Sequence, residues 1–211
     1  MDDFDRLAPL TPVPLVPEIR LHRTSDIYGL WERTAEPAPP FWAIPWTGGQ
    51  ALARYVLDHR QLVRGRRVLD VGAGSGLVAI AAALAGATIV IAADIDARAI
   101  AAISRNSRAN GVAVNAVLMD ALHRDGDDAD VVLVGDAFYE RELAQRMLAF
   151  LRRASHRGAS VLVGDIGRTY LPRHSLIPLT SYDVPVLADV EDASVKHTTV
   201  FAFGSDATVA T

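Results

Sequence analysis

Residues 67–77, Arg-Val-Leu-Asp-Val-Gly-Ala-Gly-Ser-Gly-Leu, constrain the fold more than any other stretch of the chain. An apolar run carries an acid, Asp70, breaks at three alternating glycines and continues into an alanine-rich segment. Glycine lets backbone N–H groups approach a polar ligand, because no Cβ holds the ligand away. The positive end of the helix that follows then faces the ligand. The stretch therefore predicts a strand, a ligand-binding loop at Gly72, Gly74 and Gly76, and a helix.

The composition describes one globular domain and limits its partners. The chain has 211 residues, of which half are hydrophobic and 22% are charged, and its formal net charge is -4. This length is enough to bury a sizeable core, and the acidic balance argues against broad nucleic-acid binding, for which a basic face is expected. The sequence contains no cysteine, and its six histidines lack the spacing of metal ligands, so no metal site is predicted.

The N-terminal residues and the longest uncharged stretch bear on cellular location. Residues 1–5, Met-Asp-Asp-Phe-Asp, have neither the positive start of a secretory signal nor the acid-poor character of a transit peptide. Residues 71–93 lack charge, but four glycines interrupt them and residues 88–91 have strand composition. A buried helix followed by a buried strand is therefore expected instead of a membrane span. We expect a cytoplasmic protein without membrane attachment.

The remaining chain reads as an arm followed by one domain. Residues 1–17 contain four prolines and no periodicity, which predicts an extended arm on the domain or a disordered one. Residues 18–211 are predicted to form a single domain, beginning with a short strand at 19–22. Thr47 is expected to cap a helix that starts nearby.

Alternating strands and helices predict an α/β fold. Strands are expected at residues 68–71, 88–93, 114–119, 131–134 and 160–163, with helices at 77–85, 97–110 and 140–153 between them. This order indicates a mostly parallel sheet with helices on both faces. Two further strands, at 182–188 and 195–203, are separated by an acidic turn at 189–192 and predict a C-terminal antiparallel hairpin.

Acidic residues end two further strands at the edge where α/β sheets bind ligands. Leu77 stands where the dinucleotide fingerprint G-x-G-x-x-G requires its third glycine, and no phosphate-loop motif occurs. Asp94 is positioned to accept both ribose hydroxyls of an adenosine, and Asp120 to accept a bond from an adenine amine. Helix capping is the alternative for Asp120, and it is the favoured one for Asp96.

These residues resemble class I S-adenosylmethionine-dependent methyltransferases, through residues 68–76 and Asp94. The resemblance implies a Rossmann-like sheet of seven strands whose last hairpin is antiparallel. It implies S-adenosylmethionine as the cofactor, S-adenosylhomocysteine as the product, and the glycine loop facing the methionine moiety. The cofactor contacts that it implies are Trp46, Asp70, Gly72, Gly74, Gly76, Asp94, Ile95, Asp120 and Asp136.

Four further segments resemble the electron transfer flavoprotein β-subunit lysine methyltransferase group. They are residues 40–55, 135–139, 162–168 and 198–203, so the resemblance spans roughly residues 18–204. Thr47 departs from it, since proline is expected there. The resemblance implies a protein-lysine N-methyltransferase whose partner is the electron transfer flavoprotein β-subunit or a similar protein bearing a target lysine.

The reaction is expected at residues 135–139, Gly-Asp-Ala-Phe-Tyr, which form an acid-x-x-aromatic frame. Adenine and glutamine methyltransferases use a related frame with two central prolines, which are absent here. The resemblance implies that Asp136 and Tyr139 are catalytic, with Asp136 orienting the lysine. The substrate contacts that it implies are Trp42, Phe138, Asp165 and Arg168. Core packing for Trp42 and Trp46, and a loop salt bridge between Asp165 and Arg168, are the alternatives.

Two other functions stay open at this stage. One is a small-molecule N-methyltransferase on the same scaffold, and the other is a non-catalytic regulator that binds the cofactor. The sequence leaves open the target lysine, the number of methyl groups added and the oligomeric state.

Overall fold

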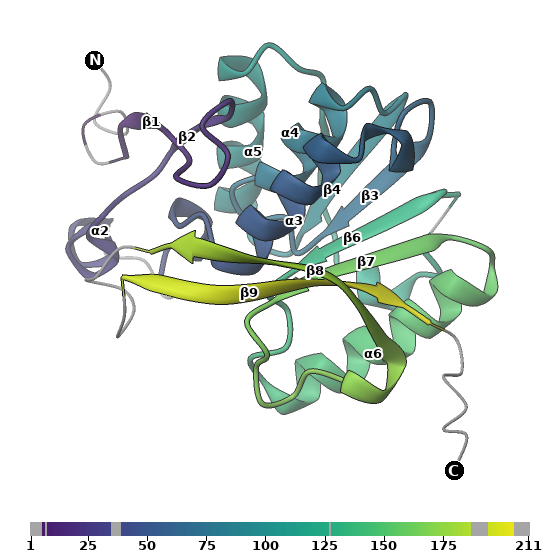
Figure 1. The fold of residues 1–211 in the computed structure, drawn as a ribbon. Helices are drawn as coiled ribbons and strands as arrows, with labels where there is room; N and C mark the ends of the chain where they lie inside the picture. The colour runs from purple at the N-terminus through teal and green to yellow at the C-terminus, as the bar shows by residue number, and fades with distance from the viewer. Residues whose placement is uncertain (1–5, 7, 35–38, 127, 187–193, 205–211) are drawn as a thin grey trace.

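A computed structural model describes residues 6, 8–34, 39–126, 128–186 and 194–204, and it contains a central sheet of seven strands (Figure 1). The strand order is β5-β4-β3-β6-β7-β9-β8. The first five strands run parallel, and β9 is antiparallel to both of its neighbours. The strands are β3 (Arg67–Val71), β4 (Ile89–Asp94), β5 (Asn115–Leu118), β6 (Val131–Gly135), β7 (Ser160–Asp165), β8 (Leu176–Pro185) and β9 (Val195–Phe203).

Helices cover both faces of this sheet, which confirms the predicted Rossmann-like α/β fold. The α-helices are α2 (Ile27–Thr34), α3 (Thr47–Asp58), α4 (Leu77–Leu84), α5 (Ala97–Ala109) and α6 (Arg141–His156). Short 3-10 turns are η1 (Phe41–Ala43), η2 (Arg60–Leu62), η3 (Ala121–His123) and η4 (Arg173–Ser175). Side chains of β3 alternate between the faces, so Val68 packs with α3, α4 and α5 while Leu69 packs with α6.

The predicted element ends agree with the structure to within three residues, except at β8. This strand begins at Leu176, six residues before the predicted start, while β9 has the predicted bounds. The first half of β8 escapes prediction because Pro178 interrupts the pattern and the pairing register shifts between Pro178 and Thr180. The predicted acidic turn at 189–192 lies outside the described residues.

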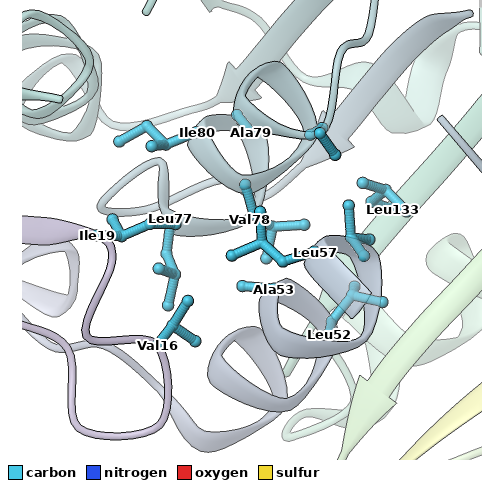
Figure 2. Close-up of a cluster of buried hydrophobic side chains, with 14 of the residues drawn as sticks. Val16, Ile19, Leu52, Ala53, Leu57, Leu77, Val78, Ala79, Ile80 and Leu133 are labelled. Atoms are coloured by element: carbon cyan, nitrogen blue, oxygen red, sulfur yellow. The ribbon is translucent and has the colours of Figure 1, made fainter. Parts of the chain in front are cut away.

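The arm contributes side chains to the hydrophobic cluster that contains residues of α3 and α4 (Figure 2). Strand β1 (Leu10–Pro12) pairs antiparallel with β2 (Arg20–His22), which confirms the predicted short strand. Val13, Val16 and Ile19 are fully buried, and Figure 2 shows Val16 and Ile19 near Leu77 of α4. Residues 13 and 16 therefore belong to the same hydrophobic cluster as the domain that follows them.

The start of α3 makes a very close backbone contact with the ends of β6 and β7. A Cβ on Gly48 would lie 2.2 Å from the carbonyl oxygen of Gly164, and a Cβ on Gly164 would lie 2.1 Å from that of Gly48. The predicted cap at Thr47 is wrong, because Trp46 is the N-cap residue and makes no side-chain cap bond. Instead, Oδ2 of Asp136 accepts a 2.9 Å hydrogen bond from the Gly49 N–H, so a distant carboxylate satisfies this helix end.

Substituting the two adjacent glycines of α3 tests this close contact. We expect Gly48→Ala to lower the free energy of unfolding by about 2 kcal/mol, because its methyl group overlaps backbone that cannot move aside. Gly49→Ala is the matched control, since its Cβ would lie 3.8 Å from the nearest side-chain atom, on Val78. It is expected to be neutral or slightly stabilising. Urea unfolding of both variants decides the matter; equal stabilities would contradict the contact.

Candidate functional site

The glycine loop connects β3 to α4 and leaves open space in front of its backbone. Gly72, Gly74 and Gly76 all have positive φ angles, of 66°, 53° and 80°. A Cβ on Gly72 or Gly74 would meet no described atom within 4 Å, whereas one on Gly76 would lie 3.1 Å from Ile103 of α5. Gly76 therefore lets the loop pack on α5, while Gly72 and Gly74 leave room for a ligand close to the main chain.

Asp94, at the end of β4, fastens the loop to the neighbouring strand. Its Oδ2 accepts a 2.8 Å hydrogen bond from the Gly74 N–H, and its Oδ1 accepts a 2.9 Å bond from the Asp96 N–H. The side chain remains partly exposed, and each carboxylate oxygen has a second lone pair available. The residue predicted to bind ribose thus lies at the glycine loop and retains acceptor capacity toward solvent.

Asp70 lies beneath the loop and is directed inward. It is 2% exposed, and its Oδ2 accepts a 3.0 Å hydrogen bond from the Ala79 N–H in the first turn of α4. Burial raises the pKa of Asp70 to about 7, against the lowering effect of that bond, and the charge of Asp94 adds to the rise. Its contact is with the helix start, so it positions the loop; a direct cofactor contact stays a prediction.

Asp96 and Asp120 both cap helical turns. Asp96 is the N-cap residue of α5 and accepts from the Arg98 N–H, which confirms the favoured interpretation. Asp120 accepts a 3.0 Å bond from the Leu122 N–H and pairs with Arg146 of α6. Burial opposes the charged form of Asp120, but Arg146 and the Leu122 N–H outweigh it and lower the pKa. Asp120 thus lies after the end of β5, where it was predicted to reach the adenine, but both of its carboxylate oxygens already have partners within the protein.

Asp136 occupies the end of β6 in a conformation that few non-glycine residues adopt. Its φ is 68°, in the left-handed region, and such backbone strain is concentrated at functional sites. The residue is 8% exposed. Oδ2 accepts from Gly49 of α3, and Oδ1 accepts a 3.1 Å bond from Nη2 of Arg168. Burial raises the pKa of Asp136 to about 6, although Arg168 and the Gly49 N–H act against the rise.

Asp165, at the end of β7, shares Arg168 with Asp136. Its Oδ1 accepts 2.7 Å hydrogen bonds from the N–H groups of Gly167 and Arg168, and its Oδ2 lies 3.9 Å from Nε of Arg168. Asp165 is fully buried, and burial raises its pKa. The alternative of a loop salt bridge is therefore present as an ion pair without a hydrogen bond between the two side chains. Asp165 is not accessible to a substrate in this conformation.

The predicted aromatic and apolar contacts divide into exposed and buried side chains. Tyr139 is 59% exposed; burial of its hydroxyl group together with the charges of Glu140 and Asp94 raises its pKa, while Arg168 lowers it. The charges of Asp94 and Arg168 therefore both act on the Tyr139 hydroxyl group, in opposite directions. Ile95 is 75% exposed at the loop after β4. Trp46 is partly buried and donates from Nε1 to the Phe41 carbonyl oxygen.

Two predicted substrate contacts are corrected by their burial. Phe138 is fully buried and belongs to the hydrophobic cluster that includes Met147, Phe150 and Leu151 of α6. Trp42 is 7% exposed and packs with Leu30, Ala43, Ala99 and Ala102, which is the core-packing alternative. Neither ring is available to a substrate in this structure.

Two buried amides that sequence reasoning missed connect the N-terminal segment to the site. Asn106 of α5 accepts from the His22 N–H and donates to the carbonyl oxygen of Ser75 in the glycine loop. Gln50 of α3 accepts from the Leu15 N–H and donates to the Pro45 carbonyl oxygen. An isolated Asn or Gln within a helix gives no sequence signal for such a role, because its partners are distant in sequence.

The described part of the chain holds neither a metal-ligand cluster nor a membrane-spanning helix. No group of three or more histidine, aspartate or glutamate side chains gathers there as a metal site would require. Within the same residues, every helix is too short or too polar to cross a bilayer.

Sequence comparison identifies the family. A Xenopus laevis protein named electron transfer flavoprotein beta subunit lysine methyltransferase is 38% identical over 203 residues, which cover 92% of this chain and 82% of the relative. Its human counterpart is 37% identical over 90% of this chain and 76% of its own length. The chain belongs to this family. It is an S-adenosylmethionine-dependent protein-lysine methyltransferase, as predicted.

A second family profile and two solved structures also resemble parts of this chain. The profile of the ribosomal protein L11 methyltransferase family matches residues 50–138, which include the glycine loop and the end of β6. A Thermoplasma acidophilum protein has a TM-score of 0.55 at 23% identity, over 74% of this chain and 85% of its own. Magnesium protoporphyrin IX methyltransferase from Synechocystis, solved with bound S-adenosylmethionine, has a TM-score of 0.53 at 15% identity, over 72% and 76%. At these identities the structures support the fold.

The buried acid of β3 predicts a pH-dependent stability. Folding raises the pKa of Asp70 from 3.8 to about 7, so the folded state binds a proton more tightly than the unfolded state does. The contribution of this proton to the free energy of unfolding is complete below pH 3.8 and is lost as pH rises through 7. Asp70→Asn cannot ionise, so it should not lose this stability. From pH 5 to pH 8 we expect its free energy of unfolding to rise by about 2 kcal/mol relative to that of wild type. Urea unfolding at both pH values measures this, with Asp128→Asn, an exposed carboxylate, as the control. A pH-independent difference would contradict the buried ionisation.

Proposed function

We propose that the methyl acceptor is a lysine of the electron transfer flavoprotein β-subunit or of a similar protein. The observation that carries the proposal is the 37–38% identity to proteins of that name over about nine-tenths of the chain. Their similarity extends past Asp136 into the C-terminal half, where Asp165 and Arg168 lie. The cytoplasmic location expected from the sequence stays a prediction.

We further propose which residues hold the cofactor. The glycine loop fits the group because substituents on Gly72 and Gly74 would project into open space, where a ligand comes close to backbone. Asp94 would hold the ribose hydroxyls with its remaining lone pairs, with Asp120 and Ile95 toward the adenine and Trp46 at the α3 side. S-adenosylmethionine supplies the methyl group on a positively charged sulfur.

The protein's main contribution to methyl transfer is positioning and desolvation, since the reaction is an in-line displacement. A free lysine has a pKa of about 10.4, so neutralising it at pH 7 costs roughly 4–5 kcal/mol. With a pKa of about 6, Asp136 is mostly ionised above pH 7 and would accept hydrogen bonds from the lysine nitrogen. The positive charge of Arg168 would lower the pKa of the lysine. The exposed ring of Tyr139 would form a wall of the lysine channel.

Ribosomal protein L11 is a second candidate acceptor, because the L11 methyltransferase profile matches this chain. A Syntrophotalea carbinolica L11 methyltransferase is 42% identical over 100 residues, but these are only 47% of this chain and 32% of the relative. The profile match at residues 50–138 ends before β7 and Arg168. It therefore supports the cofactor-binding half more than the acceptor.

Methyl labelling tests the proposed acceptor directly. The enzyme is incubated with radiolabelled S-adenosylmethionine and, separately, the electron transfer flavoprotein β-subunit or ribosomal protein L11 of the same organism. We expect label on a lysine of the flavoprotein subunit and none on L11. Mass spectrometry locates the lysine, and its replacement by arginine should remove the label. Labelled L11 with unlabelled flavoprotein subunit would reverse the proposal.

Asp136→Asn tests the catalytic role without disturbing the fold. Asparagine tolerates positive φ and retains an acceptor for the Gly49 N–H, whereas alanine does neither. We expect kcat to fall roughly 100-fold, because the charge that orients the lysine is lost. Binding of S-adenosylhomocysteine, measured by calorimetry, should change less than about twofold. An unchanged kcat would remove Asp136 from the mechanism.

A further inference from the structure

Arg168 uses only part of its hydrogen-bonding capacity in the structure. Its side chain is 21% exposed, and Nη2 donates to Oδ1 of Asp136 at 3.1 Å. Among the described residues, its buried Nε has no hydrogen-bond partner. A guanidinium group carries five N–H donors and binds a carboxylate best through two of them, so the observed single contact is incomplete.

Asp165, beside Arg168, has one carboxylate oxygen that could accept a further hydrogen bond. Its Oδ1 is fully used by the N–H groups of Gly167 and Arg168, which fix the carboxylate in place. Its Oδ2 has no hydrogen-bond partner within the described part of the chain, although the residue is fully buried. This oxygen lies 3.9 Å from Nε of Arg168, about 1 Å beyond the usual length of such a bond. A small swing of the guanidinium group would join them.

The position of Arg168 also conflicts with the predicted substrate contact. If the lysine nitrogen approaches Oδ1 of Asp136, it meets an oxygen already held by a guanidinium group. Two cations on one oxygen repel each other, whereas moving Arg168 to Asp165 leaves each buried carboxylate with one cation. Oδ2 of Asp136 accepts the Gly49 N–H, and this bond holds the carboxylate in its present orientation.

We infer that Arg168 is a positioning residue that holds Oδ1 of Asp136 until the substrate lysine arrives and then transfers to Oδ2 of Asp165. The inference rests on the proposed lysine acceptor. Arg168 keeps Asp136 ionised and oriented in the free enzyme, and after the transfer its charge remains near the lysine and favours the neutral amine. Asp165 provides the second position of the arginine without contacting the substrate.

A double-mutant cycle tests the transfer. Asp165→Asn retains Oδ1 for the two backbone N–H groups but removes the charge that attracts Arg168. At saturating cofactor, we expect it to raise KM for a peptide carrying the labelled lysine roughly fivefold, because the arginine stays on Asp136. In an Arg168→Ala background the same substitution should leave KM unchanged. If Asp165→Asn raised KM by the same factor with and without Arg168, the inference would be overturned. Such a result would mean that Asp165 does not act through the arginine.

The titration of Asp136 gives a second readout that needs no turnover. The groups that face Asp136 are Arg168, Asp165 and the Gly49 N–H, and of these Arg168 is the one cation. In protein labelled with 13C-aspartate, NMR should therefore show a higher pKa for Asp136 in Arg168→Ala than in wild type. Arg141→Ala removes a positive charge from α6 that lies over Tyr170, and should leave the titration unchanged. The Asp136 signal is assigned by its loss in Asp136→Asn.

These readouts separate two kinds of failure. If no lysine is labelled, the proposed function fails, while the NMR titration still decides whether Arg168 holds Asp136. If lysine is labelled but the cycle is multiplicative, or the Asp136 titration is the same with and without Arg168, the inference fails and the function stands. Calorimetry with S-adenosylhomocysteine on all four proteins of the cycle confirms that each retains a folded cofactor site.

Discussion

The hydrogen bond between the Gly49 N–H and the Asp136 carboxylate holds the proposed catalytic acid in place. It connects the first turn of α3 to the end of β6, and the close backbone approach of Gly48 and Gly164 brings these elements within reach. The carboxylate accepts an N–H group of the first turn of α3, and the positive end of a helix dipole favours a negative charge at this position. This contact therefore ties the start of α3 to the end of β6 and fixes the acid at the proposed position of methyl transfer.

The acids along the carboxyl edge of the sheet differ in pKa because they differ in burial and in their charged partners. Asp70 is sealed beneath the loop with a pKa raised to about 7, Asp136 is nearly buried with a pKa raised to about 6, and Asp120 is held charged by Arg146. Three residues of one chemical type thus serve different purposes because their surroundings differ. The glycine loop and Asp94 form the cofactor side, whereas Asp136 and its arginine form the acceptor side.

Local sequence patterns predicted the fold well, because each of them depends only on residues that are close together in the chain. The loop at Gly72–Gly76, the cap at Asp96 and the alternation of strands and helices each depend on neighbouring residues. Contacts between distant segments gave no such signal. The capping of α3 by Asp136 and not Thr47 depends on a residue almost ninety positions away, and the burial of Phe138 and Trp42 depends on which helix covers them. An aromatic beside a motif has the same appearance whether it faces substrate or core.

A ternary complex would test the role of Asp136 most directly. The measurement is a crystal structure with S-adenosylhomocysteine and a peptide carrying the labelled lysine. We predict the lysine nitrogen within about 3 Å of a carboxylate oxygen of Asp136, facing the cofactor sulfur, with α3 in its present position. A lysine bound elsewhere, with Asp136 still enclosed by Gly49 and Arg168, would contradict the proposed site of methyl transfer and reduce Asp136 to a structural cap.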